Sequence, residues 1–353
     1  MIWVSTRKNC ALGAIVTTCF AATSALYPTA APADENGISF WLPGIYGSLA
    51  AAPLNPGLSL ATVYYHTSVS ADGATAASRE IAIGRLNPTT SVNLNVNLHV
   101  DVDLALINPN YVFATPVLGG QFALGFATFI GHNSTSLDGI LTAMAGPVVT
   151  TSAGSIDSSV SGFGDLFPQA SLRWNQGVNS FMAYLTGDIP VGAYDSTRLA
   201  NLGIGHGAVD GGVGYTYLDP QTGRELSIVT GLTYNFKNYS TDYQSGIDWH
   251  LDWGASQFLS KQFFVGAVGY LYDQITADSG AAAFLGSNES RVAAVGPQIG
   301  YIFPLGEYQG FLGAKSYFEF GASRRPEGWN SWLTFVISPG AQPAPPNSML
   351  PRK

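Results

Sequence analysis

Beyond its first 20 residues, this 353-residue sequence contains no cysteine, since Cys10 and Cys19 are its only two. The rest of the chain therefore cannot form a disulfide, a thiolate nucleophile or a thiolate metal site. Charged residues are also scarce, at 11% of the sequence, against about 25% in an average soluble protein. This scarcity, together with 41 glycines and 12% aromatic residues, argues against a soluble enzyme and favours a chain that is partly solvated by lipid.

Long apolar runs are missing as well. After residue 33, no uncharged apolar run reaches the roughly 18 residues that a membrane-spanning helix requires. A lipid-solvated chain without such helices is expected to be a closed β-barrel, because lipid cannot satisfy the open edge of a sheet.

The N-terminus has the features of a secretory signal peptide. Arg7 and Lys8 form a positive start, residues 11–26 are small or apolar, and residues 31–33 form an A-P-A cleavage motif. We expect residues 1–33 to be removed, which changes the net charge from −8 to −10 because two basic residues are lost. An acidic exported protein without a basic patch is not expected to bind nucleic acid.

Residues 92–106 alternate between apolar and polar side chains. The apolar positions are Val92, Leu94, Val96, Leu98, Val100, Val102, Leu104 and Leu106, and His99, Asp101 and Asp103 lie among the polar ones. Successive side chains of a strand point to opposite faces, so one face is apolar and the other is polar. A soluble sandwich would place the apolar face in its core, whereas a membrane barrel would place it in lipid and the polar face in the lumen. We favour the barrel.

Twelve segments have the length and composition of membrane-crossing strands. They span about residues 58–70, 91–107, 119–132, 163–175, 178–190, 208–218, 225–238, 246–258, 261–274, 291–304, 308–321 and 329–338. Short links, such as 176–177 and 305–307, alternate with long ones, such as 133–162 and 275–290. Short periplasmic turns and long extracellular loops are typical of outer-membrane barrels. The sequence therefore predicts an all-β, antiparallel transmembrane barrel of about 12 strands, within a range of 10–14.

The segments on either side of the barrel lack this alternation. Residues 34–56 are predicted to form a periplasmic lead-in or a small plug, and residues 57–338 the barrel. The proline-rich residues 339–353 are predicted to form a disordered tail.

The polar faces of the strands supply the residues that we expect in the lumen and along the solute pathway. They are His99, Asp101, Asp103, Arg173, Lys237, Asp248, His250, Asp252, Lys315 and Glu319. These charges could close the lumen with salt bridges, or they could line a passage that selects solutes. Aromatic and small residues expected along the path of an apolar solute are Phe129, Tyr194, Phe284, Ala123, Gly125 and Ala127.

Signals for catalysis and cofactors are weak. The chain has no G-x-S-x-G motif, and the glycine-rich residues 203–207 form an expected outer loop rather than a phosphate-binding turn. His99 and His250 each lie near two aspartates, but residues two apart on a strand are about 7 Å apart, too far for one strand to build a compact metal site. We predict no metal, no cofactor and no enzymatic activity.

Several short stretches, taken in order, resemble one family of exported proteins. They are Phe40-Trp41-Leu42-Pro43-Gly44, residues 63–68, Gly162-Phe163-Gly164-Asp165 with Pro168, Arg173-Trp174, Asp188-Ile189-Pro190-Val191-Gly192 with Tyr194-Asp195, and residues 295–301. This set resembles the SphA-type proteins, also described as the meta-pathway phenol degradation family, over about residues 38–338. The resemblance implies an outer-membrane β-barrel that takes up small apolar or aromatic molecules, and it supplies no catalytic residues.

We therefore predict a monomeric channel in the outer membrane of a Gram-negative bacterium, through which small hydrophobic or aromatic solutes pass by facilitated diffusion. Its partners would be outer-membrane lipid and the solute, with no obligate protein partner. Two alternatives stay open: a structural or adhesive barrel with a plugged lumen, and a soluble periplasmic β-sandwich that binds a ligand.

Overall fold

The computed structural model describes residues 40–72, 93–145, 148–280 and 289–340. Its strands are β1 (Gly57–Asp72), β2 (Asn93–Val112), β3 (Gln121–Ala145), β4 (Val148–Phe163), β5 (Phe167–Gln176), β6 (Asn179–Asp188), β7 (Ala208–Asp219), β8 (Arg224–Asn235), β9 (Tyr243–Gln244), β10 (Asp248–Phe258), β11 (Phe263–Gln274), β12 (Ser279–Gly280), β13 (Arg291–Leu305), β14 (Tyr308–Ser323) and β15 (Glu327–Pro339). Within the described ranges, no helix has the length and apolarity needed to cross a membrane. The predicted signal peptide lies outside these ranges.

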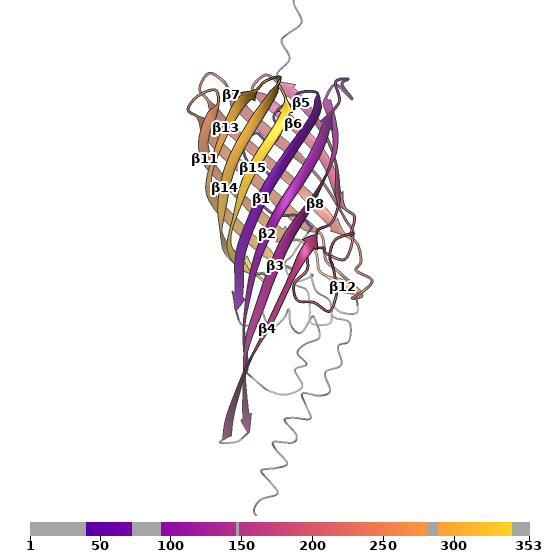
Figure 1. Cartoon of the computed structure of the whole chain (residues 1–353), viewed down its shortest axis with the longest axis vertical. Coiled ribbons are helices and arrows are strands. Elements are labelled where there is room, and N and C mark those ends of the chain that lie inside the picture. The colour runs from indigo at the N-terminus through magenta and orange to yellow at the C-terminus, as the bar shows by residue number, and fades with distance from the viewer. Residues whose placement is uncertain (1–39, 73–92, 146–147, 281–288, 341–353) are drawn as a thin grey trace, which may run out of the picture.

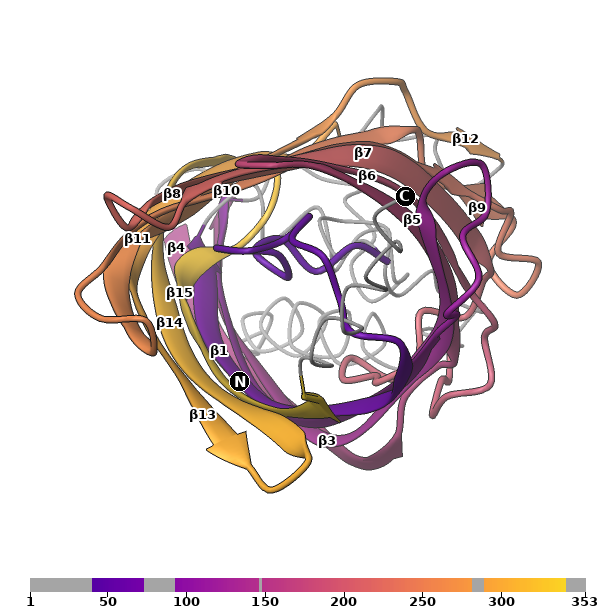
Figure 2. The ribbon, with the colours of Figure 1, turned by 90° about the horizontal axis from the view of Figure 1, so that it is seen from above.

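Twelve of the strands close into one antiparallel barrel (Figures 1 and 2). β1 pairs with both β15 and β2, β2 pairs with β3, and β3 pairs with β5. The remaining members pair in chain order from β5 to β15. This closure confirms the predicted all-β barrel of about 12 strands. The two-residue strands β9 and β12 form a separate antiparallel pair.

β4 is the one long strand that the sequence analysis did not predict. Residues 133–162 were expected to be a loop, but β3 continues to Ala145 and β4 returns beside it from Val148. β4 and β5 lie end to end along β3, and Figure 1 shows the β3–β4 ribbon extending past the barrel rim. This stretch is rich in serine, threonine and glycine, so it lacks the apolar alternation by which the other strands were recognised.

The two rims of the barrel differ in the length of their links. At one rim, two-residue turns join β5 to β6 and β13 to β14, and Gly177 and Gly306 adopt positive φ angles of 70° and 62° there. Glycine is favoured at such positions because it has no Cβ. At the other rim, residues 189–207 and 236–247 form longer links. The first rim is therefore periplasmic and the second extracellular.

The outer surface of the barrel carries an apolar belt. Large side chains exposed on it include Leu124, Phe126, Ile130, Leu226, Leu232, Tyr234, Leu312, Phe318 and Leu333. Within β3 and within β8 these residues lie an even number of positions apart, so they share one face of their strand. A closed sheet with an apolar exterior satisfies its backbone internally and suits a bilayer, so the chain is a transmembrane barrel.

β2 has the opposite orientation from the one predicted. Val96, Leu98, Val100 and Leu104 are all buried, at 1–5% exposure. They pack inwards, in part against Leu199 of the β6–β7 link. The polar face, which carries His99, Asp101 and Asp103, lies on the outside instead. The prediction that these three residues face the lumen was therefore wrong, because the extracellular half of the lumen at β2 is apolar.

Candidate functional site

The chain preceding β1 runs through the inside of the barrel. We call residues 40–56 the lumen segment, and Figure 2 shows it within the ring of strands, in indigo. At its end, Leu54 exchanges two hydrogen bonds with the Gln121 side chain of β3, and the Asn55 amide donates to a carbonyl oxygen of β15. Strands on several sides of the barrel therefore hold the segment across the lumen.

Asp252 and Lys315 bind the main chain of this lumen segment. The two carboxylate oxygens of Asp252 accept hydrogen bonds from the backbone N–H groups of Gly44 (2.9 Å) and Tyr46 (3.1 Å). The Lys315 ammonium donates to the carbonyl oxygens of Gly44 (2.6 Å) and Ile45 (3.0 Å). Buried charges need such partners, and here the lumen segment supplies them.

Nearer the periplasmic rim, other polar side chains continue this pattern. Glu225 of β8 accepts hydrogen bonds from the backbone N–H of Leu49 at 2.8 Å and from the hydroxyl of Ser48 at 2.5 Å. The hydroxyl of Thr216 in β7 accepts one from the backbone N–H of Ala51 at 2.9 Å. Because most of these contacts are to main-chain atoms, the barrel wall fixes the path of the lumen segment largely independently of the segment's side chains.

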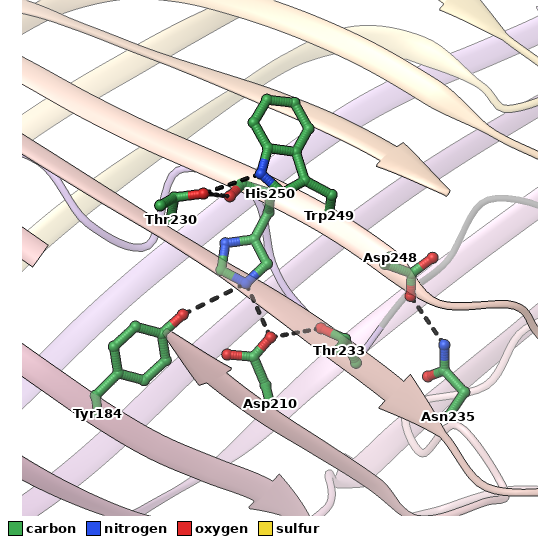
Figure 3. A network of polar contacts seen from close by, with 8 residues as sticks. All are labelled: Tyr184, Asp210, Thr230, Thr233, Asn235, Asp248, Trp249 and His250. Carbon is green, nitrogen blue, oxygen red and sulfur yellow. Dashed lines mark hydrogen bonds and ion pairs between the residues drawn. The ribbon is translucent and has the colours of Figure 1, made fainter. Parts of the chain in front are cut away.

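A buried histidine lies beside the lumen segment (Figure 3). His250 Nε2 of β10 is 2.8 Å from Asp210 Oδ2 of β7, and neither side chain is exposed. The Thr233 hydroxyl of β8 donates to the same Asp210 oxygen at 2.6 Å. The imidazole also stacks on Trp41, with ring centroids 3.7 Å apart and planes inclined by 14°. The cluster of His250, Asp210 and Thr233 therefore joins β7, β8 and β10 to the lumen segment.

On the extracellular side of the lumen segment, the barrel contains a cavity of about 190 Å³. Its apolar wall is formed by Phe40, Leu42, Pro43, Val69, Val100, Val102, Leu104, Phe129, Phe167, Leu202 and Ile204. Phe129 and Phe167 are nearly parallel, with ring centroids 6.1 Å apart. Residues 40–43 belong to the lumen segment, so this apolar cavity and the segment share a boundary.

A polar cluster forms another part of the cavity wall. The Tyr270 hydroxyl donates to Glu319 Oε1 at 2.7 Å and accepts from the Asn330 amide at 3.0 Å. The other Glu319 oxygen accepts from the backbone N–H of Gly328 at 2.9 Å. Arg325, from the β14–β15 link, also lines the cavity. The site therefore combines an aromatic surface with a few convergent polar groups, as ligand pockets commonly do.

Six of the ten residues predicted to line the lumen point into the barrel. They are Arg173, Asp248, His250, Asp252, Lys315 and Glu319. Lys237 lies in the link that follows β8 rather than in a strand, and it pairs there with Asp242. His99, Asp101 and Asp103 lie on the outer face, as described above. A role for the six inward residues in solute passage stays a prediction.

Only some of the aromatic residues predicted to lie along the solute path line the apolar cavity. Phe129 lines the apolar cavity, whereas Tyr194 lies in the β6–β7 link, where its hydroxyl accepts a hydrogen bond from Asn238 at 2.9 Å. Phe284 lies outside the described residues.

Sequence reasoning missed several residues of the site, among them Asp210, Glu225, Tyr270 and Arg325. Glu225 is buried whereas its neighbour Leu226 is exposed on the outer face, so the alternation of this strand carried the signal. Arg325 lies in a link between strands, where no periodicity exists to indicate its direction.

Among the described residues, no group of three or more histidines, cysteines and carboxylates is arranged to bind a metal ion. Inward carboxylates such as Asp252 and Glu225 are instead occupied by hydrogen bonds to the lumen segment.

The closed barrel, its apolar belt and its lumen define a class of protein, the outer-membrane β-barrel. More specifically, the chain belongs to the family described as "Putative MetA-pathway of phenol degradation", which it matches over residues 54–335. This match confirms the resemblance found in the sequence. A comparison with curated proteins finds no match.

In structure, the chain is similar to the COG4313 outer membrane channel from Pseudomonas putida F1. The TM-score is 0.60 at 13% sequence identity, and the match covers 84% of this chain and 99% of that chain. A FadL homologue from Pseudomonas aeruginosa gives a TM-score of 0.38 at 10% identity, covering 89% and 98% of the two chains. At 13% identity the first match shows a shared fold, and the second score is too low to support an argument.

Proposed function

We propose that this protein is an outer-membrane channel that lets small hydrophobic or aromatic molecules enter the cell by facilitated diffusion. The observation that carries the proposal is the apolar cavity of about 190 Å³ in the extracellular half of the barrel. An engineered apolar cavity of about 150 Å³ binds benzene, so this cavity has room for a single ring with small substituents. The similar Pseudomonas putida protein is described as an outer membrane channel, which supports the same function.

In this mechanism, the solute enters from the extracellular rim and binds among the rings of Phe40, Phe129 and Phe167. The lumen segment lies beyond the cavity and is held by Asp252 and Lys315. A bound solute would continue past the lumen segment, or it would leave sideways into the bilayer. The sequence has no nucleotide-binding motif, so the solute gradient would drive the passage, and we assign no chemical reaction to the chain.

Solute flux into liposomes that carry the refolded protein tests this function. Phenol-like aromatics should enter faster than sugars of similar size, and Phe129→Ser should slow the aromatics because it removes part of the apolar wall. The control substitution is Phe318→Ser, which removes a ring of the same kind from the outer belt. Folding of each variant is checked by the heat-modifiable gel shift of intact barrels.

Two outcomes would contradict the proposal. Equal entry of aromatics and sugars would indicate a general pore. No flux from a correctly folded barrel would favour the alternative of a structural or adhesive barrel, whose lumen segment acts as a permanent plug.

A further inference from the structure

Two neighbouring arginines in the β14–β15 link point to different surroundings. Arg324 lies 3.6 Å from Glu289 in an exposed ion pair. Arg325 lines the apolar cavity, and its guanidinium carbon lies 5.0 Å from the centre of the Tyr272 ring. One arginine therefore faces a carboxylate outside the cavity, and the other faces the cavity.

The carboxylates and amides around this cavity already have partners within the protein. Asp165 accepts hydrogen bonds from the backbone N–H groups of Gly192 (2.6 Å) and Ile204 (2.8 Å). Glu319 accepts from Tyr270, as described above, and from a backbone N–H. The three lining amides are bonded too: Asn133 donates to a carbonyl of the β6–β7 link, Asn201 bonds within that link, and Asn330 donates to Tyr270.

The guanidinium of Arg325 differs from these groups. Its Nε is buried without an acceptor, and no hydrogen bond or ion pair to Arg325 is found within the described part of the chain. A buried donor that lacks an acceptor is energetically unfavourable. A ligand oxygen placed in the cavity beside Arg325 would supply the guanidinium with an acceptor, while the ligand's apolar body would contact the phenylalanines.

We propose that the cavity selects an aromatic ring bearing one acceptor oxygen, and that Arg325 is the residue that recognises this oxygen. The inference rests on the proposed function and adds the substrate class to it. A plain hydrocarbon would fit the apolar wall but leave the guanidinium without an acceptor. A phenolic hydroxyl and a carboxylate would each supply the required oxygen.

The charges around the cavity favour the hydroxyl over the carboxylate. Glu319 and Asp165 both line it, so an anionic ligand would add a third negative charge against the single guanidinium. A neutral hydroxyl can accept from Arg325 and still donate to a carboxylate. The expected order of affinity is therefore 4-methylphenol, then 4-methylbenzoate, then toluene.

Isothermal titration calorimetry of the full-length barrel in lipid nanodiscs tests this order, with empty nanodiscs correcting for partition of each compound into lipid. Arg325→Gln should weaken binding of 4-methylphenol by about tenfold, the value of one hydrogen bond to a charged group, and should leave toluene unchanged. Arg324→Gln is the matched control, because it removes the adjacent arginine without touching the cavity, and it should change neither. Glu319→Gln should raise the affinity for 4-methylbenzoate relative to 4-methylphenol.

The outcomes separate this proposal from the proposed function. If toluene binds as tightly as 4-methylphenol, or if Arg325→Gln weakens all three ligands equally, then Arg325 does not recognise an oxygen, although the barrel can still be an uptake channel. If none of the three compounds binds to the unsubstituted protein, the cavity is not a ligand site and both proposals fail. Unchanged binding of 4-methylphenol to Arg325→Gln also overturns the inference.

Discussion

Strands β2 and β10 carry almost the same pattern of histidine and aspartate, and the barrel turns them in opposite directions. In β10, Asp252 and His250 face the lumen and contact the lumen segment. In β2, His99 and Asp101 form a pair 2.9 Å apart on the outer surface, and the apolar side chains between them face inwards. Alternation therefore defines the two faces of a strand, and what lies on each side of the wall decides which face is the inner one.

The polar faces of β2 and β10 point in opposite directions because they lie at different heights along the barrel axis. The β10 residues lie level with the lumen segment, which supplies N–H and C=O groups as partners. The β2 residues lie closer to the extracellular rim than Ile107, an apolar residue exposed on the outer face. Among them, Asp103 hydrogen-bonds to His66 and Tyr64 on β1. Charges on a lipid-facing surface cost most at the middle of the bilayer and little near its edges. The outward polar face of β2 therefore marks the extracellular edge of the apolar belt.

The largest expected effect comes from breaking the inner polar face. Asp252→Ala would leave the N–H groups of Gly44 and Tyr46 without an acceptor and Lys315 without a nearby carboxylate. Removing one partner of a buried charged cluster typically costs about 3–5 kcal/mol, so the free energy of unfolding in urea should fall by that amount. Asp101→Ala on the outer face should change it by less than about 0.5 kcal/mol. Equal losses for both variants would contradict the assignment of the two faces.

A matched pair of histidine substitutions should give a smaller difference. His250→Ala removes the stack on Trp41 and one of the two partners of the buried Asp210 oxygen. An unsatisfied buried group and a lost ring contact together predict a loss of about 2–3 kcal/mol in the free energy of unfolding. His99→Ala removes only an exposed pair and should be close to neutral. Chemical denaturation of both variants in the same lipid measures the contrast.

The barrel was predictable because the alternation within each strand shows which of its residues share a face. Leu226 and Leu232 alternate with less apolar neighbours, and a period of two is a signal that each strand carries by itself. The orientation of β2 was not predictable in this way. Whether Val100 or Asp101 faces inwards depends on Leu199, which comes from a distant link and packs against the inner face.

The site was less predictable than the fold. His250, Asp252 and Lys315 were recognised as inward residues, but Asp252 and Lys315 bind main-chain atoms of the lumen segment, and backbone groups leave no trace in the sequence. Arg325 gave no signal either, since it lies outside any strand.

A substitution in the lumen segment tests how this segment docks against the inner wall of the barrel. Gly44 has a φ of 86°, and a Cβ there would lie 2.9 Å from the Tyr317 ring, so Gly44→Ala should weaken docking of the segment by about 1–2 kcal/mol. Planar-bilayer recordings should then show more frequent open events. Gly119→Ala is the control, because Gly119 also has a positive φ but has no atom near its Cβ position. Equal effects of the two variants would mean that backbone strain, rather than the contact with Tyr317, is responsible.

The smallest expected effect belongs to the outer face of β2, and it decides the orientation most directly. If Asp101 and Asp103 face outwards, converting both to asparagine should leave aromatic flux unchanged, because neither carboxylate touches the cavity.

Thiol labelling sharpens the result, since the chain has no cysteine beyond residue 19. On intact cells, a membrane-impermeant maleimide should label Asp101→Cys much faster than Val100→Cys, whose side chain is 5% exposed and lines the cavity. Faster labelling of Val100→Cys would restore the predicted orientation, with the aspartates in the lumen. If neither cysteine reacts, the outer face of β2 lies within lipid, and the extracellular edge of the belt must be placed higher on this strand.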